Sequence, residues 1–240
     1  MSDWAAKRFW KETAVEAAAD GAGFEVRLDG RMVRTPAKTP LVLPTRAMAE
    51  AVAREWDAQE GKINPLGMPV TRGANAALDK VAAQHSEVAD MIADYGDSDL
   101  LCYRAASPAE LIARQAQAWD PLLDWAETAL DARLLPRTGV IHQPQDSGAI
   151  AALRERVHAL DPFELAAFHD LVAMSGSLVI GFAALHEYAP ISQLWDLSRI
   201  DEDWQIEQWG KDDEAAELAE VKRAAFMSAL TFYQLVHTKP

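Results

Sequence analysis

The spacing of apolar residues changes from a strand period to a helical period near residue 70 of this 240-residue chain. In Phe24–Pro36, "FEVRLDGRMVRTP", apolar and charged residues alternate, which is typical of a half-buried strand. The dipeptide Asp29-Gly30 within it favours a two-residue hairpin turn. Beyond residue 70, apolar residues recur every three or four positions, as they do in amphipathic helices. A small β-rich part is therefore predicted to precede a helical part.

Local signals place the boundary between these parts. "PLVLPT" at Pro40–Thr45 predicts another short strand, and Thr45 can cap a helix that runs to Gly61. The proline- and glycine-containing stretch "NPLGMPVT", Asn64–Thr71, is the best candidate for a linker. We therefore expect an α+β protein of two domains. Residues 1–70 form a small β-rich N-terminal domain with one helix, and residues 71–240 form a larger all-helical C-terminal domain.

Helix starts recur in the second part. "SPAE" at Ser107–Glu110 is predicted to be a capping box with proline in the first helical position. "DPFE" at Asp161–Glu164 repeats the signal with aspartate as the cap. Asp120-Pro121 is predicted to restart or kink a helix, since proline removes a backbone donor. A last helix is expected at about Asp213–Val236.

The charge is unevenly distributed. Residues 1–75 carry eleven Lys and Arg against ten Asp and Glu, whereas residues 76–240 carry twelve against twenty-seven, which gives the net charge of −14. A nucleic-acid partner would require a basic surface, and the second part would repel a phosphate backbone. We therefore expect no nucleic-acid partner, and any partner of the second part should be basic or neutral.

The chain also shows no sign of membrane insertion or secretion. Its longest uncharged run, Leu171–Leu185, has fifteen residues, which is short for a membrane span and predicts a buried helix. Cys102 is the single cysteine, which excludes an intramolecular disulfide and fits a reducing compartment. The first residues, "MSDWAAKRFW", lack a secretory signal. An intracellular protein without membrane insertion is expected.

Motifs for catalysis or cofactors are weak. The glycines of "DGAGFEV" precede a strand, whereas a dinucleotide-binding fingerprint follows one. The six histidines never occur at metal-ligand spacing, and Cys102 has no neighbouring ligand. We therefore expect no cofactor, no metal and no catalytic residues. An alternative stays open: a metal-dependent enzyme whose carboxylates converge with His169 or His186.

One acidic stretch stands out, "IDEDWQIEQWGKDDEAAE" at Ile200–Glu217. It holds eight carboxylates and two tryptophans. Carboxylates in the first turn of a helix gain about 0.3–1 kcal/mol each from the helix dipole, so two helix starts are predicted here. Aromatic residues ringed by charge are also typical of surfaces that bind another protein. The residues alone leave a solvated acidic face and a docking face equally open.

Several phrases together resemble one family. They are "LDGRMVRTPAKTPLVLPT" (Leu28–Thr45), "AREWDAQEGKINPLGMPVTRGANAALD" (Ala53–Asp79), "DLLCYRAASPAELIARQAQAWDPLLDW" (Asp99–Trp125), "SGSLVIGFAAL" and "IDEDWQIEQWGKDDEA". In this order they resemble the ATP synthase assembly chaperones that escort the alpha subunit, the "ATP-twelve" family of mitochondria and alphaproteobacteria. The resemblance covers about Arg8–Phe232.

The resemblance implies a chaperone and not an enzyme. Members of the family bind the unassembled alpha subunit transiently, without a nucleotide, a metal or a small-molecule substrate. The resemblance also implies a strand within "RFWKETAVEAA", Arg8–Ala18, whose composition alone would favour a helix. The expected location is the bacterial cytoplasm, or the mitochondrial matrix for a processed eukaryotic protein. In "TRGANAALD", Gly73 is expected to occupy a helix start, where the family usually has a larger apolar residue.

The family's acidic motif falls on Asp201, Glu202, Trp204, Gln205, Glu207, Trp209, Gly210, Asp212 and Glu214. The partner-binding residues expected from it are Asp201, Glu202, Asp203, Trp204, Glu207, Trp209, Asp212 and Glu214. Structural or interdomain roles are expected for Trp56, Gln59, Asp99 and Arg104. Trp56 should pack its helix onto the strands or the second domain, with direct partner contact as the alternative. Arg104 should form an internal pair with a carboxylate, with ligand binding as the alternative.

Overall fold

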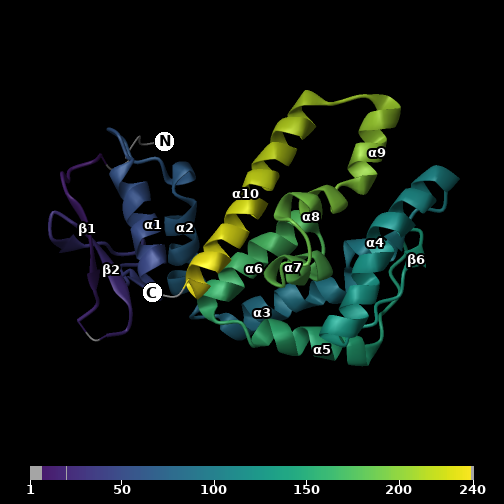
Figure 1. The fold of residues 1–240 in the computed structure, drawn as a ribbon, viewed down its shortest axis with the longest axis horizontal. Helices are drawn as coiled ribbons and strands as arrows, with labels where there is room; N and C mark the ends of the chain where they lie inside the picture. The colour runs from purple at the N-terminus through teal and green to yellow at the C-terminus, as the bar shows by residue number, and fades with distance from the viewer. Residues whose placement is uncertain (1–6, 20, 239–240) are drawn as a thin grey trace. The chain divides into compact units, whose positions relative to one another are not determined.

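The computed structural model describes residues 7–19 and 21–238 (Figure 1). The chain forms two compact units. Unit 1 comprises residues 1–85, 162–167 and 231–240, and unit 2 comprises residues 86–161 and 168–230. Residues 162–167 and 231–240 thus belong to unit 1 although they follow unit 2 residues in the sequence. A single division of the sequence cannot describe this arrangement. The predicted domain boundary after residue 70 stays a prediction.

Unit 1 contains a four-stranded antiparallel sheet. Strand β2 (Phe24–Leu28) pairs with β1 (Thr13–Ala17), β3 (Arg31–Met32) and β4 (Val42–Leu43). Asp29 (φ 47°) and Gly30 (φ 77°) form the turn between β2 and β3 in the left-handed region that two-residue hairpins require, as predicted. Strand β1 lies in the segment where the family resemblance implied a strand, so composition was misleading there.

Helix α1 (Arg46–Asp57) covers this sheet in unit 1 (Figure 1). The Thr45 hydroxyl oxygen accepts a hydrogen bond from the Met48 N–H (3.1 Å), which confirms the predicted cap. The helix ends at Asp57, earlier than predicted. Alternating residues of β2 and the inner face of α1 meet in one apolar core, whose fully buried members include Val26, Leu41, Leu43, Met48 and Val52.

The helical pattern that follows is divided into short pieces. A 3₁₀ turn (Pro65–Gly67) precedes α2 (Pro69–Ala76), a π-helical turn (Ala77–Val81) and α3 (His85–Ala93). Gly73 lies within α2, not at a helix start. A Cβ atom at Gly73 would lie 2.7 Å from the Phe232 ring, and both residues belong to unit 1. Close packing of this ring therefore explains the glycine.

Unit 2 is helical, as expected, apart from one short parallel pair, β5 (Tyr103–Arg104) with β6 (Arg137–Thr138). Two 3₁₀ turns, Asp94–Ser98 and Leu100–Cys102, follow α3. The remaining helices of the chain are α4 (Ala109–Leu130), α5 (Ser147–His158), α6 (Pro162–Ser175), α7 (Leu178–Leu185), α8 (Ile191–Leu197), α9 (Ile200–Trp209) and α10 (Asp213–His237). Helices α6 and α10 start at the predicted residues.

One prediction about α4 is wrong, and another is wrong in one of its two alternatives. The helix begins at Ala109, so Pro108 holds the cap position without a side-chain bond and Ser107 lies one residue too early to form a capping box. The helix also continues through Pro121, so it does not restart there, and the kink that was the other possibility stays a prediction. Proline removes a single backbone donor, and the burial of neighbours such as Trp119 and Leu122 stabilises the continuous helix.

The uncharged run Leu171–Leu185 is buried as predicted, but it is not one helix. Helix α6 ends at Ser175, Gly176 adopts a left-handed φ of 73°, and α7 starts at Leu178. Residues 178–184 are all buried, which places α7 in the core of unit 2. Within the described residues, no helix is both long and apolar enough to span a membrane.

Candidate docking groove beside α9

The acidic stretch forms two helix starts, as predicted. Asp201, Glu202 and Asp203 lie in the first turn of α9, and Asp213 and Glu214 begin α10. The Asp212 carboxylate accepts a hydrogen bond from the Ala215 N–H (2.8 Å), which satisfies a free donor at the start of α10. Helix capping thus accounts for the position of some of these acidic residues. The others are considered with the surface beside α9.

A groove of about 630 Å³ lies beside α9 within unit 2. One wall consists of the segment Tyr103–Pro108, which leads into α4, together with Leu111 and Gln115 of α4. Gly139 and Val140, which follow β6, add to the lining. Five residues of α9 complete the groove: Asp201, Trp204, Gln205, Gln208 and Trp209.

Side chains of α4 hold α9 in place, and the two helices lie side by side (Figure 1). The Gln115 amide donates a hydrogen bond to the Asp201 carboxylate (2.6 Å). Arg114 donates two hydrogen bonds of 2.8 Å each to Glu207, and its guanidinium lies 5.0 Å from the centre of the Trp204 ring. Paired hydrogen bonds between arginine and a carboxylate fix orientation as well as distance, so the groove is held open by a defined helix position.

The other acidic residues differ in whether their carboxylates form hydrogen bonds or ion pairs within the chain. Glu202 accepts a bond from Arg199 (2.7 Å). In the described part of the chain, the carboxylates of Asp203 and Glu214 have no hydrogen bond or ion pair, and both residues are exposed. Loss of solvent around the carboxyl raises the pKa of Asp203 above its usual value, although the nearby positive charges of Arg199 and Arg114 act in the opposite direction. A basic group that approaches Asp203 would stabilise its charged form.

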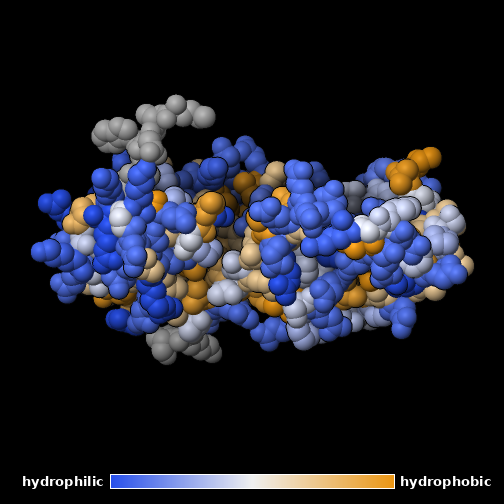
Figure 2. Space-filling view, turned by 90° about the horizontal axis from the view of Figure 1, so that it is seen from above, coloured by the Kyte–Doolittle hydropathy of each residue, from blue (hydrophilic) through white to orange (hydrophobic). Residues whose placement is uncertain are grey.

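Apolar side chains stand exposed at the edge of the groove. Val140 is 91% exposed and Trp209 is 79% exposed, although both belong to large apolar types. Figure 2 shows that hydrophilic residues cover most of the viewed face and that apolar residues reach it in small groups. Two such side chains from separate segments of the chain at one groove are a feature of surfaces that bind another protein.

Comparison with known proteins identifies the family. The family model described as "ATP12 chaperone protein" matches residues 7–127. The chain belongs to the ATP12 chaperone family. The mitochondrial protein atp12 of Schizosaccharomyces pombe is 25% identical over 224 residues, covering 88% of this chain and 76% of the relative.

The crystal structure of Atp12 from Paracoccus denitrificans superposes with a TM-score of 0.93 and 46% identity, covering 98% of this chain and 100% of that one. A variant of that protein with one aspartate replaced by lysine gives the same values. The ATP12 family model ends before α9, whereas the structural match extends over almost the whole chain, so the fold around the groove is shared with Atp12.

Trp56 and Gln59 of this ATP12-family chain lie at the end of α1 in unit 1. The Trp56 ring packs edge-on against the Trp10 ring (5.3 Å between centres). The Gln59 side chain donates to the Glu55 carbonyl (2.9 Å) and accepts from the Asn64 N–H (2.7 Å). Both side chains thus make contacts within unit 1, and their structural or interdomain roles stay predictions.

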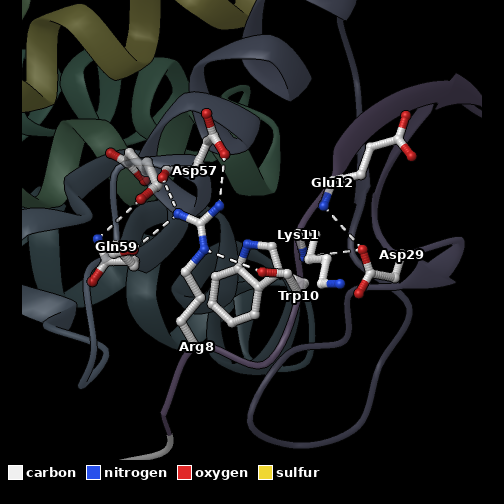
Figure 3. Close-up of polar contacts among 8 residues, drawn as sticks. Arg8, Trp10, Lys11, Glu12, Asp29, Asp57 and Gln59 are labelled. Atoms are coloured by element: carbon white, nitrogen blue, oxygen red, sulfur yellow. Dashed lines mark hydrogen bonds and ion pairs between the residues drawn. The ribbon is translucent and has the colours of Figure 1, made fainter.

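Figure 3 shows how this end of α1 is tied to the N-terminal segment. The Arg8 guanidinium points between Asp57 and Gln59 and donates to the carbonyl oxygens of both, with a further bond of 3.0 Å to the Asp57 carboxylate. Nearby, the Asp29 carboxylate accepts from the N–H groups of Lys11 and Glu12. Those bonds lower the pKa of Asp29. Hydrogen bonds between side chains and backbone groups thus fix the N-terminal segment to α1 and to the turn after β2.

Asp99 is fully buried in unit 2. One of its carboxylate oxygens accepts from the Leu101 N–H and the other from the Val179 N–H at the start of α7, each at 3.0 Å. Burial nevertheless raises the pKa of Asp99 from 3.8 to about 6. Asp99 therefore joins the turn before β5 to the core helix.

Arg104 is paired internally. It donates to the Leu101 carbonyl (2.7 Å), forms an ion pair with Asp120 (2.8 Å) and lies over the Trp119 ring. Arg104 also lines the groove, and the sequence did not indicate this second position.

No metal-ligand cluster occurs among the described residues: three or more His, Cys, Asp or Glu side chains are nowhere placed to hold one ion. His169 contacts its neighbour Asp170 (2.9 Å), and the His186 ring packs against Trp125. Neither histidine lines the groove.

Sequence reasoning missed Arg114, Gln115 and Val140. Arg114 and Glu207 are 93 positions apart, and no local pattern connects them. Only Val140 had a sequence signal, as an apolar residue next to Gly139 in a segment without strand or helix periodicity.

Proposed function

We propose that this protein is an assembly chaperone for the catalytic sector of the proton-translocating ATP synthase and that it binds the unassembled alpha subunit. Membership of the ATP12 chaperone family carries the proposal. The groove beside α9, with exposed apolar side chains and acidic neighbours, supports it as a surface suited to a protein partner.

The proposed role follows from what a free subunit exposes. An alpha subunit without its beta neighbours presents the surface that it will later bury, and such a surface aggregates readily. A chaperone that covers this surface and yields to beta needs no catalytic residue and no nucleotide, metal or small-molecule substrate. The protein acts in a bacterial cytoplasm, or in the mitochondrial matrix of a eukaryote.

The carboxylates of the acidic stretch contribute unequally to partner binding. Glu207 and Glu202 are engaged by Arg114 and Arg199, and Asp212 caps α10. Asp203 and Glu214 are exposed and have no such engagement in the part of the chain that the structure describes. Their charges are therefore available to basic residues of the alpha subunit.

Charge reversal tests this proposal. The double variant Asp203→Lys, Glu214→Lys should remain folded and should lose most of its affinity for the alpha subunit in a pull-down or calorimetric assay. The matched control, Glu87→Lys with Asp124→Lys, makes the same charge change at exposed positions of unit 2 that do not line the groove. Equal binding by both double variants would show that the acidic stretch is only a solvated face.

A further inference from the structure

We propose that the groove beside α9 binds an extended segment of the partner subunit in which an apolar side chain lies within about three residues of a lysine or arginine. The identity of the partner rests on the proposed function. The chemistry of the segment rests on the groove itself.

The apolar requirement follows from the residues at the groove's edge. Val140 and Trp209 are among the most exposed large apolar side chains of the described chain, and both line the groove. Pro108, just before α4, and Leu111 of α4 also line the groove. A tryptophan can bury about 150–250 Å² in an interface, which makes aromatic side chains frequent binding hot spots. An apolar side chain of the partner that enters here would remove this surface from water.

The basic requirement follows from the charges that line the groove. In the described chain only two lining residues are charged, Arg104 and Asp201. The positive charge of Arg104 is matched by Asp120 at 2.8 Å. Asp201 instead receives its bond from the neutral amide of Gln115, which leaves its negative charge uncompensated.

The surroundings reinforce this negative potential. Unit 2 carries 25 Asp and Glu against 10 Lys and Arg, a net charge of −15. A lysine or arginine of the partner would form a charge-assisted hydrogen bond with Asp201, and the field of the unit would favour its approach.

The size and polar groups of the groove favour an extended segment over a helix. A helix with its side chains is about 10–12 Å wide, whereas cavities of about 300–1,000 Å³ hold ligands of drug size. At about 630 Å³ the groove accommodates a few residues. Gln205 and Gln208 line it, and their amides make no hydrogen bond within the described residues, so they can pair with an extended backbone.

Three variants at the groove test the inference with purified full-length protein. Val140→Ser and Trp209→Ala should each raise the Kd for the alpha subunit at least tenfold, with an unchanged melting temperature because both side chains are exposed. Asp201→Asn keeps an acceptor for Gln115 and removes only the charge. It should weaken binding and reduce its dependence on salt. Ile141→Ser and Leu218→Ala change exposed apolar residues that do not line the groove, and they should bind as the unmodified protein does.

A peptide array that covers the alpha-subunit sequence identifies the bound segment. Bound peptides should share an apolar residue close to a lysine or arginine, and they should lose binding to the Trp209→Ala variant. Peptides without a basic residue that bind equally well would overturn the inference.

Two other outcomes separate the inference from the proposed function. If the groove variants bind the alpha subunit normally while Asp203→Lys, Glu214→Lys does not, the groove is not the binding site, although the proposed function stands. If Val140→Ser and Trp209→Ala alter only self-association in light scattering, the occupant is a second copy of this chain and the inference is wrong. Failure of the unmodified protein to bind the alpha subunit would refute the proposed function itself.

Discussion

Arg114 of α4 binds Glu207 of α9 through two parallel hydrogen bonds of 2.8 Å each. Because both oxygens of Glu207 are bound by Arg114, this carboxylate of the acidic stretch is not available to a partner. The bond pair also holds α9 at a fixed distance from α4, so the groove between them has a defined width. Glu207 is therefore both a member of the acidic stretch and part of the contact that positions α9.

Replacing Arg114 by leucine should loosen α9 without unfolding the protein. Backbone amides of α9 should exchange hydrogen faster, and the difference should shrink at high salt because both partners are partly exposed. Arg133→Leu is the control: it removes an arginine whose contact to Glu127 is long, at 3.9 Å. It should leave the hydrogen exchange of α9 unchanged. Hydrogen exchange read by mass spectrometry decides the matter. Equal protection of α9 in both variants would contradict the role given to Arg114.

Asp99 should make the stability of the protein depend on pH between about 4 and 6. Its pKa is raised to about 6 in the folded state, so the folded protein binds this proton more tightly than the unfolded chain. The stabilisation by the protonated form is complete below the unfolded pKa of 3.8 and is lost as the pH rises through about 6. At about 1.4 kcal/mol per pKa unit, the change is on the order of 3 kcal/mol.

The variant Asp99→Asn isolates this effect, since other carboxylates titrate in the same window. It cannot titrate and it loses one of two acceptors, so it should be less stable than the unmodified protein throughout. The difference in the free energy of unfolding should grow as the pH falls from 7 to 4.5. A pH-independent difference for Asp99→Asn would show that Asp99 has an ordinary pKa.

Gly73→Ala should destabilise unit 1 despite the better helix propensity of alanine. The added methyl would lie 2.7 Å from the buried Phe232 ring, and overpacking costs about 1–3 kcal/mol against a gain of about 1 kcal/mol. A second change, Phe232→Leu, should partly restore the lost stability by making room. Gly67→Ala, whose new methyl meets only Asn64 at 3.9 Å, should be tolerated. Chemical denaturation of the four proteins provides the test, and a stabilised Gly73→Ala protein would disprove the packing argument.

Removal of divalent metals should leave the protein unchanged. Dialysis against EDTA should alter neither its melting temperature nor its binding to the alpha subunit, because the proposed interaction uses carboxylates as partners of basic residues. Elemental analysis of the untreated protein completes the test. A divalent metal at one equivalent, lost together with stability, would support the alternative of a metal-dependent enzyme.

Local features of the fold were predictable from the sequence where a short segment determines its own structure. Asp29-Gly30 forms the expected turn, Thr45 caps α1, and α10 begins at Asp213. Predictions that depended on competition between local signals and packing were less successful. The start of α4 shifted past Pro108, and the helix passed through Pro121 because burial of its neighbours outweighs the lost bond.

The groove could not be predicted from the sequence. Its lining joins the segment before α4, the residues after β6 and one face of α9, which are brought together only by the tertiary fold. The sequence indicated that the acidic stretch is unusual. It could not separate Glu207, which is bound by Arg114, from Asp203, which has no such partner in the described residues. That distinction depends on side-chain geometry across about ninety positions of sequence.

The measurement that tests the central claim most directly is co-purification of this protein with its cognate alpha subunit, first without and then with the beta subunit. We predict a soluble complex with alpha alone and its replacement by an alpha–beta complex when beta is added. Absence of any complex with alpha, under conditions in which both proteins are folded, would contradict the account.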